Sequence, residues 1–230
     1  MNWLPNFKNL EQTLTSLGAV GKEELAFQIA PHYLAEVMSK YFRMTLSGTE
    51  NLPKNGPALM TPNHSGYSGF DAFLLGHHVQ KASGRQPQIL THKLWFASES
   101  TGRIMERLGF IEATTNNGLS HLVKGEMVVL FPEGEYGNFK PTLKRYHLQK
   151  FKRGFVRTAI RSQSPIIPTL ILGAEETHIN LARLKITKYL KGRGLLLPLP
   201  LNIIPLPAKW HIHFMKPIYL PYTEDQANNS

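Results

Sequence analysis

The stretch Met127-Val128-Val129-Leu130-Phe131-Pro132-Glu133-Gly134 carries the clearest signal of fold in this chain. Its five consecutive apolar residues are typical of a strand buried on both faces, and Pro132 ends the run. Strands of this kind occur in parallel sheets that helices cover on both sides. The acid Glu133 follows at the exit of the strand, where α/β sheets collect their ligand sites.

Similar strand patterns alternate with helical patterns on both sides of this stretch. We expect strands at residues 58–60, 88–90, 166–172 and 210–214, and helices at 70–79, 93–108, 118–124 and 151–161. Such alternation with short loops predicts an α/β fold, with a mixed, largely parallel sheet flanked by helices.

The first 45 residues have a helical pattern without strands. Leucines at positions 10, 14 and 17 recur at helical spacing, and a second run after Pro31 is amphipathic. The apolar face of this second run consists of Tyr33, Leu34, Val37, Met38, Tyr41 and Phe42. Two interpretations of the amphipathic segment stay open: packing on the core, or contact with a membrane surface or a substrate groove.

The composition fits one globular domain. The chain has 230 residues, of which 42% are hydrophobic and 18% are charged, and this balance excludes a disordered tail or a coiled coil. It contains no cysteine, so disulfides, thiolate zinc sites and cysteine nucleophiles are excluded. The longest apolar run, 194–207, is too short to span a membrane as a helix and holds four prolines.

A histidine and a carboxylate frame the loop after the strand expected at 58–60. The segment reads Asn63-His64-Ser65-Gly66-Tyr67-Ser68-Gly69-Phe70-Asp71, and its two glycines permit a tight turn. Asp71 can bind one imidazole nitrogen of His64, which leaves the other nitrogen available to take a proton from a hydroxyl. The nucleophile would then be a hydroxyl of the substrate. The alternative is a histidine that caps a helix and has no chemical role.

Other reaction classes find little support in the motifs. Residues 66–70 lack the second glycine of a G-x-S-x-G elbow, which argues against a serine hydrolase. The chain has no G-x-x-x-x-G-K-[ST] loop and no strand-flanked G-x-G-x-x-G, the two common nucleotide-binding patterns. The histidine pairs at 77–78 and at 211 and 213 lack a carboxylate cluster, so we expect no metal site.

Four sequence blocks in this order resemble the glycerolipid acyltransferase superfamily, which contains lysophospholipid and glycerol-3-phosphate acyltransferases. The blocks are Asn63-His64 with Asp71, Leu108-Gly109-Phe110-Ile111, Phe131-Pro132-Glu133-Gly134 and Pro165-Ile166-Ile167-Pro168. The stretches 173–176 and 204–210 are similar to a bacterial glycerol acyltransferase-like branch. The resemblance covers roughly residues 50 to 220. Together with the helical pattern at the start of the chain, it predicts a helical segment at 1–45, an acyltransferase domain at 46–222 and a tail at 223–230.

The resemblance also implies an activity. It is that of an O-acyltransferase, which moves a fatty acyl group from the thioester of acyl-CoA or acyl carrier protein to a hydroxyl of a (lyso)glycerolipid. His64 would be the general base, Asp71 would orient it, and backbone donors of the motif loops would stabilise the oxyanion. No covalent acyl-enzyme, bound cofactor or metal is implied. The residues expected to bind substrate are Asn63, Ser65, Gly66, Glu133, Gly134, Glu135, Lys140, Lys144 and Arg145.

The sequence departs from the common family pattern in three places. The acid follows the histidine with H-x6-D spacing instead of H-x4-D. Glu135-Tyr136 replace the Thr-Arg that follows F-P-E-G in acylglycerol-phosphate members, and no arginine follows Ile111. Both missing arginines bind phosphate in the family. Two possibilities follow: either Lys140, Lys144 or Arg145 takes their place, or the acceptor has no phosphate.

The charge balance points to an anionic partner. Lysine and arginine total 26 against 16 acids, a formal charge of +10, and no acid lies between Glu135 and Glu175. A second basic cluster at 183–193 directly precedes the apolar run. Cations beside an apolar segment fit an anionic membrane surface better than nucleic acid. We therefore expect peripheral association with the cytoplasmic face of the cell membrane, without a transmembrane helix. Docking of acyl-CoA phosphates or of an acidic acyl carrier protein is a second use of the same cations.

Two rival functions stay open at this point. A lipid or anionic-surface binding module with an inactive site would bind without turnover. A thioesterase or esterase would use water in place of the lipid alcohol. The sequence leaves the acceptor, the acyl chain length, the donor and the oligomeric state open.

Overall fold

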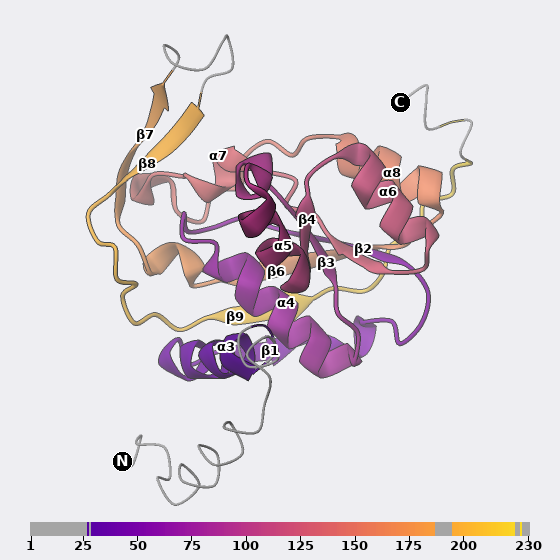
Figure 1. Ribbon diagram of the computed structural model, residues 1–230, viewed down its shortest axis with the longest axis horizontal. Coiled ribbons are helices and arrows are strands. Elements are labelled where there is room, and N and C mark those ends of the chain that lie inside the picture. The colour runs from indigo at the N-terminus through magenta and orange to yellow at the C-terminus, as the bar shows by residue number, and fades with distance from the viewer. Residues whose placement is uncertain (1–26, 28, 187–194, 224–225, 227–230) are drawn as a thin grey trace, which may run out of the picture.

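The computed structural model describes residues 27, 29–186, 195–223 and 226 of the chain. Within these residues a seven-stranded sheet forms the centre, and helices cover both of its faces (Figure 1). A two-stranded hairpin projects from one end of the molecule. The expected α/β fold with a mixed, flanked sheet is confirmed, whereas the helix expected around residues 10–17 and most of the 223–230 tail lie outside the described residues.

The sheet is mixed because its strands run in two directions. Its members, in spatial order, are β1 (Thr45–Ser47), β9 (His211–Phe214), β6 (Ile166–Leu172), β2 (Ala58–Pro62), β5 (Met127–Val129), β3 (Gln88–Thr91) and β4 (Phe110–Glu112). Five neighbouring strands, from β6 to β4, are parallel to one another, while β9 is antiparallel to β6 and pairs in parallel with β1. The separate hairpin pairs β7 (Asn180–Ile186) with β8 (Leu195–Pro200).

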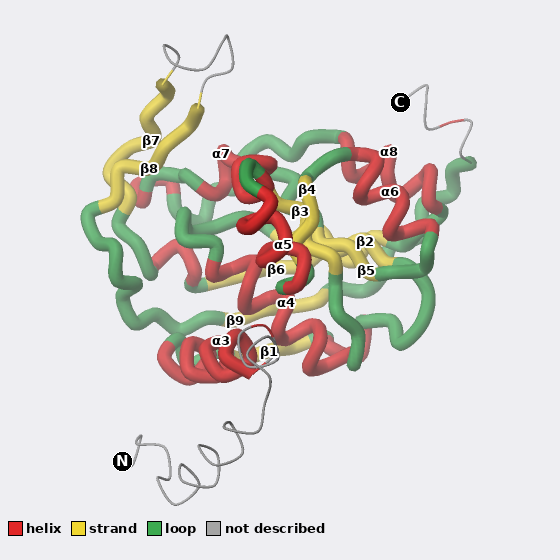
Figure 2. Tube along the Cα trace, in the orientation of Figure 1, coloured by secondary structure: helices red, strands yellow, loops and turns green. Residues whose placement is uncertain are grey.

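Helices lie on both faces of this sheet. The α-helices are α3 (Ala30–Tyr41), α4 (Phe70–Ser83), α5 (Glu99–Arg107), α6 (Thr115–Val123), α7 (Glu135–Asn138) and α8 (Gly154–Ser162). Short 3₁₀ helices occur at Thr49–Asn51, Lys93–Phe96, Thr142–Lys144 and Ala174–Glu176. Figure 2 shows α6 and α8 next to each other at one end of the sheet, with α3 and α4 below its opposite part.

Alternation along the central strand β2 divides the core into two parts. Ala58 and Met60 pack into the part under α3 and α4, which includes Leu74. Leu59 points to the other face and packs with Leu122 of α6. All of these side chains are fully buried, and each leucine and methionine among them contributes roughly 1.5–3 kcal/mol when its apolar surface leaves water. The core therefore fixes β2, and with it the loop that follows β2.

The helix expected at 93–108 is interrupted. Ser98 adopts an extended conformation, and its side chain accepts a hydrogen bond from the backbone N–H of Thr101. A serine that caps a helix in this way starts a new helix, because it satisfies a backbone donor that the first turn leaves open. Residues 93–96 consequently form a separate 3₁₀ turn, and α5 begins at Glu99.

The amphipathic helix α3 turns most of its apolar face outward. Tyr33, Leu34, Val37 and Tyr41 are exposed, whereas Ala35 and the following Phe42 are completely buried. Of the two interpretations left open for this face, packing on the core holds for Phe42 but not for these four residues, because α3 contacts α4 with its opposite side. Among the described residues no helix has the length and hydropathy needed to cross a bilayer.

The carboxyl ends of the parallel strands meet at one edge of the sheet. Residues 63–69 follow β2, residues 130–134 follow β5, and residues 173–179 follow β6. Because β2 lies between β5 and β6, these three loops are neighbours in space. This edge is the place where a parallel α/β sheet builds ligand sites.

Candidate active site

The loop after β2 brings a histidine and an aspartate together. His64 Nδ1 lies 2.6 Å from Asp71 Oδ2, and Asp71 belongs to the first turn of α4. The Asp71 side chain has no exposed surface, while that of His64 is 15% exposed. An acid that binds Nδ1 keeps the proton there, so Nε2 of neutral His64 presents a lone pair. The ring is thus arranged as a base that substrate can reach.

Asp71 is itself held in place from two directions. Its Oδ2 accepts the backbone N–H of Ser65 at 2.9 Å, and its Oδ1 accepts that of Ala72 at 2.8 Å. The chain reaches this geometry through Gly66 and Gly69, which have φ of +78° and +73°. Only glycine adopts such angles without strain, so the two extra residues of the H-x6-D spacing are absorbed in a tight loop.

Glu133 lies under the same histidine and is completely buried. Its Oε1 accepts the backbone N–H of His64 at 3.1 Å, and its Oε2 accepts that of Gln149 at 2.6 Å. The rings of His64 and Phe131 stack, with their centroids 4.1 Å apart. These contacts favour a positioning role for Glu133 over the direct contact with acceptor that the sequence suggested.

The side chain of Asn63 links the loop after β2 to strand β6. Its side chain makes two hydrogen bonds to the backbone of Ile171, accepting from N–H at 2.7 Å and donating to C=O at 3.0 Å. It joins the loop after β2 to the neighbouring strand β6 and is buried. The amide thus uses one donor and one acceptor in holding the loop, and its expected substrate contact stays a prediction.

A small polar pocket lies beside His64 in the chain: Ser65 and Gly66, the next two residues, line it, although His64 itself does not. Its lining includes Ser65, Gly66, Lys140 and Arg145 of the expected substrate-binding set, whereas Lys144 is exposed and is not part of it. Ser65 is part of this lining, and its Oγ is buried without a hydrogen-bond partner within the described part of the chain. Buried polar atoms are normally paired, so an ordered water is the natural partner here.

The cations of this pocket are largely compensated. Lys140 Nζ lies 2.5 Å from Glu175 Oε1 and 3.7 Å from Glu133 Oε2, and its side chain is only 4% exposed. Glu175 also accepts the backbone N–H of Tyr146. The amino group of Lys140 is thus already bound between two carboxylates, which leaves Arg145 as the exposed cation of the lining.

The remaining expected residues lie on the other side of the loop after β5. Glu135 pairs with His92, with Nε2 and Oε1 3.1 Å apart. Gly134 has φ of +57°, and a methyl group added to it would come within 3.3 Å of Lys152 Nζ. Lys152 therefore sits directly above the F-P-E-G turn, although no sequence block pointed to it.

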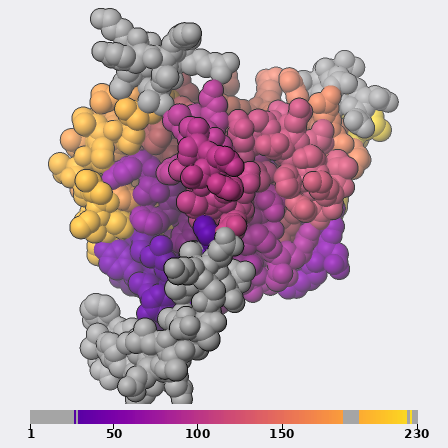
Figure 3. All heavy atoms as spheres, viewed as in Figure 1, coloured from indigo at the N-terminus to yellow at the C-terminus, as the bar shows by residue number. Residues whose placement is uncertain are grey.

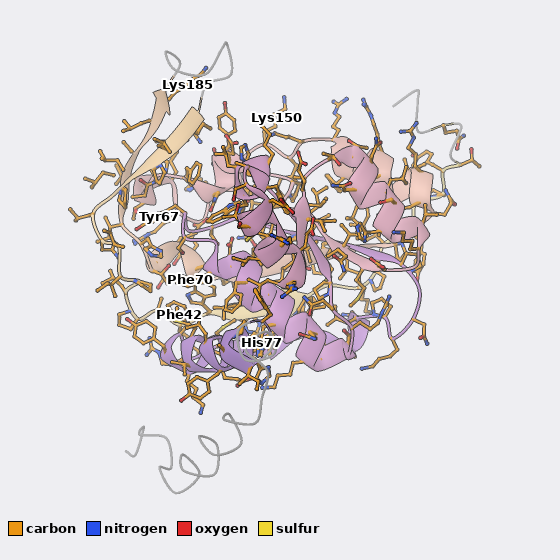
Figure 4. The ribbon with its side chains drawn as sticks, viewed as in Figure 1. Phe42, Tyr67, Phe70, His77, Lys150 and Lys185 are labelled. Carbon is orange, nitrogen blue, oxygen red and sulfur yellow. The ribbon has the colours of Figure 1, made fainter. Side chains whose placement is uncertain are left out.

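Two aromatic residues at the site were missed by sequence reasoning. Tyr67 lines the pocket, and its ring centroid lies 4.5 Å from that of His178 (Tyr67 is labelled in Figure 4). Burial lowers the pKa of the His178 imidazole, which favours the neutral ring. His178 follows β6 at the same edge of the sheet as His64. Its position after an expected strand was the one feature of the sequence from which a place at the site could have been predicted.

A larger cavity of about 650 Å³ lies elsewhere, between α3, the later turns of α4 and strands β3 and β4. It shares no lining residue with the pocket beside His64. Its apolar floor includes Phe73 and Ile89, and its polar lining includes His32 and Lys81. Ser65 and Gly66, which directly follow His64 in the chain, line the smaller pocket and not this cavity, so we place the candidate chemistry at the smaller pocket.

The Acyltransferase family model matches residues 43–172, a range that contains all four sequence blocks. The chain belongs to the Acyltransferase family. The resemblance to glycerolipid acyltransferases that these blocks suggested is thereby confirmed. The matched range includes β2, β5 and β6 and the segment that carries His64 and Asp71.

Two mycobacterial proteins are among the relatives. An uncharacterised protein of Mycobacterium tuberculosis is 34% identical over 227 residues, which cover 91% of this chain and 62% of the relative. An uncharacterised protein of Mycobacterium leprae is 35% identical over 197 residues, covering 81% and 54% respectively. The chain thus spans about 62% or less of the length of these relatives.

A solved structure supports the fold. The 1-acyl-sn-glycerophosphate (LPA) acyltransferase PlsC from Thermotoga maritima superposes with a TM-score of 0.53 and 15% sequence identity. The match covers 96% of this chain and 84% of that one. At this level of identity the likeness establishes a common α/β architecture, while donor, acceptor and mechanism remain matters for proposal.

Proposed function

We propose that the protein transfers a fatty acyl group from a thioester to a lipid hydroxyl, with His64 as general base. The observation that carries this proposal is the 2.6 Å contact between His64 Nδ1 and the buried Asp71, in a chain of the Acyltransferase family. A pure binding module has no need of an oriented base, and this argues against the rival reading of an inactive site.

The reaction follows from the position of the proton. Nε2 of His64 removes the proton from the acceptor hydroxyl as its oxygen attacks the thioester carbonyl. A C–O bond forms, the C–S bond breaks, and the departing thiolate receives the proton back from the imidazolium. Asp71 stabilises that imidazolium, and backbone N–H groups of the two motif loops stabilise the oxyanion. No covalent acyl-enzyme is required.

The donor is proposed to be acyl-CoA or acyl-carrier protein. Basic, exposed side chains follow α7 in the loop that leads to α8, and Lys150 in this loop is labelled in Figure 4. No acid interrupts residues 136–174. Such a surface suits the phosphates of coenzyme A or the acidic face of a carrier protein.

The acceptor is proposed to carry an uncharged polar head at the pocket beside His64. The support is that Lys140, one of the two cations in the lining, already lies between Glu133 and Glu175. Arg145, the other, is exposed, and lining groups such as Ser65 and Thr142 are neutral. A phosphate would have to compete with two carboxylates for the same ammonium. An acylglycerol head, in contrast, needs no free cation.

Membrane association is part of the proposal because both substrates are amphiphiles. The formal charge of +10 supports attraction to anionic lipids, where each cation near the surface contributes on the order of 1 kcal/mol. The exposed apolar face of α3 supports contact with the interface.

The test is a substrate panel with the products identified by mass spectrometry. Acyl-CoA and acyl-carrier protein are offered as donors, and lysophosphatidic acid, monoacylglycerol and diacylglycerol as acceptors. The proposal predicts an acylated neutral glyceride as the main product. Rapid thioester loss without any acylated lipid would instead establish a thioesterase. Tight lipid binding without loss of any thioester would establish the binding module.

A further inference from the structure

A row of exposed apolar side chains runs along one margin of the molecule. It consists of Leu197, Leu199, Leu201, Ile203, Ile204 and Leu206, and we call it the apolar rim. Ile203 and Ile204 are 86% and 80% exposed. Single exposed apolar residues are common, whereas a contiguous row of them marks an interaction site. In Figure 3 the yellow spheres of this segment form the left margin of the molecule.

Hydrogen bonds to neighbouring segments hold the backbone of the rim in place. Asn202, in its middle, donates through its side-chain amide to the carbonyls of Thr177 at 3.0 Å and Ile204 at 2.7 Å, and it accepts the N–H of Ile179 at 2.7 Å. The backbone N–H of Leu206 donates to Thr177 at 2.8 Å. Polar groups are thus turned inward and satisfied, while the isoleucines beside them are held in solvent.

The rim continues into helix α3. The hydroxyl of Tyr41 donates to the carbonyl of Pro205 at 2.7 Å, and the ring of Phe42 stacks on Trp210 with centroids 4.5 Å apart. The outward apolar face of α3, described above, therefore borders the segment 201–206. The one acid of α3, Glu36, is turned toward α4, where it pairs with Lys81 at 2.5 Å.

The rim also borders the active site. Tyr67, which lines the pocket beside His64, donates its hydroxyl to the backbone carbonyl of Asn202. The rim therefore lies on the same side of the molecule as the carboxyl edge of the sheet. An amphiphile held at the rim has its polar end near the pocket.

The charges around the rim are of one sign. No acid occurs from residue 177 to residue 223, while this range contains seven lysines and arginines. Lys185 lies exposed near the outer end of the hairpin (Figure 4), and Lys40 and Arg43 are exposed at the end of α3. Exposed hydrocarbon flanked by cations complements an anionic bilayer, whose surface is negative and whose interior accepts apolar side chains.

We propose that the apolar rim, together with the outward face of α3, inserts into an anionic membrane and places the pocket beside His64 against the lipid. The placement of the pocket against lipid rests on the proposed function, because it matters only if the protein acts on a lipid. Membrane binding by the rim does not require turnover. Docked in this way, a lipid alcohol reaches His64 without leaving the membrane interface.

The experiment measures binding separately from catalysis. Full-length protein is sedimented with vesicles of phosphatidylglycerol and phosphatidylcholine, and with vesicles of phosphatidylcholine alone. The variant Ile203→Ser with Ile204→Ser is compared with a control, Val123→Ser with Tyr219→Ser, whose residues are 69% and 75% exposed but lie outside the rim. The rim variant should lose at least about tenfold in partitioning into the anionic vesicles, and the control should behave as the original protein. Binding should also weaken with salt and on neutral vesicles.

Turnover of a short-chain soluble thioester with a soluble acceptor separates the two proposals. The rim variant should retain this turnover and lose transfer to acceptors embedded in vesicles. Equal vesicle binding by the rim variant and the original protein would contradict the proposal that the rim inserts into the membrane. Loss of carrier-protein binding in the rim variant, with unchanged vesicle binding, would contradict it as well. Absence of turnover with every substrate would contradict the proposed function and leave the binding result standing. A second variant, Leu199→Ser with Leu201→Ser, repeats the test should the first fail to fold.

Discussion

Asp71 explains most of what His64 can do. The carboxylate accepts from Nδ1 of the imidazole and from the backbone N–H groups of Ser65 and Ala72. It therefore fixes both the orientation of the ring and the nitrogen that carries the proton. It also provides the charge that stabilises an imidazolium during turnover.

Replacing Asp71 with asparagine should lower kcat by roughly a hundredfold to ten-thousandfold, the range expected when an oriented base loses its tautomer. The amide nitrogen would donate where the carboxylate accepts, so Nδ1 would lose its proton and Nε2 would hold it. Steady-state kinetics measure the loss, and circular dichroism checks that the fold persists. Undiminished turnover in Asp71→Asn would show that the acid has no orienting role.

Glu133 offers a test of positioning as distinct from substrate contact. Glu133→Gln replaces one accepting oxygen with a donor that faces the N–H of either His64 or Gln149. A buried donor facing a donor costs about 1–3 kcal/mol, and we expect a lower melting temperature together with a reduced kcat.

The two roles of Glu133 predict different kinetics. If Glu133 positions the backbone of His64, the loss falls on kcat and the KM for acceptor stays close to its original value. A rise in KM alone, with kcat and stability retained, would restore the direct acceptor contact that the sequence suggested.

At the scale of elements, α3 and α4 are joined through a buried histidine. His78 of α4 lies 2.9 Å from the hydroxyl of Ser39, which itself donates to the carbonyl of Ala35. Nε2 of His78 is therefore the donor, and Nδ1 is buried without a hydrogen-bond partner in the described part of the chain. Burial lowers the pKa of His78 from 6.5 to about 4.

This depressed pKa predicts a stability change with pH. The unfolded chain binds a proton at His78 below pH 6.5, but the folded chain does so only near pH 4, so stability is complete above pH 6.5 and falls as the pH drops toward 4. The loss amounts to at most roughly 3 kcal/mol. Urea unfolding at pH 7.5 and pH 5 measures it.

The variant His78→Gln serves as the control for this effect, because its amide can still donate to Ser39 and does not titrate. It should show a smaller difference in unfolding midpoint between the two pH values. Glu36, whose pKa is lowered to about 2 chiefly by its hydrogen bond with Lys81, loses its contribution in a separate window, below pH 4.5. Equal pH dependence in the variant and the original protein would rule out His78 as the source.

Periodicity predicted most elements but could not show what each face contacts. The strand at 166–172 was located because a short, mostly apolar run is typical of a buried strand in an α/β chain. The helix expected at 93–108 was wrong because the cap at Ser98 is local chemistry that an apolar pattern does not show. The outward face of α3 was missed as a definite outcome because amphipathicity tells which residues share a face, while tertiary packing decides where that face points.

At the scale of the whole molecule, the sheet topology assembles the site. His64, Glu133 and His178 come from three loops that are far apart in the sequence, and the order β6-β2-β5 makes them neighbours. The pair His64–Asp71 could be predicted because it is local. Lys140 between two carboxylates, and Tyr67 against His178, depend on contacts between distant loops that spacing in a single chain does not reveal.

Acyl transfer by purified protein carrying His64→Gln tests the central claim most directly. Labelled acyl-CoA is offered with a monoacylglycerol acceptor, and the labelled lipid product is counted beside that of the original protein, with vesicle binding as the check that the variant is folded. The account predicts that transfer falls by about a thousandfold or more while vesicle binding is unchanged. Transfer by His64→Gln at the rate of the original protein would contradict it.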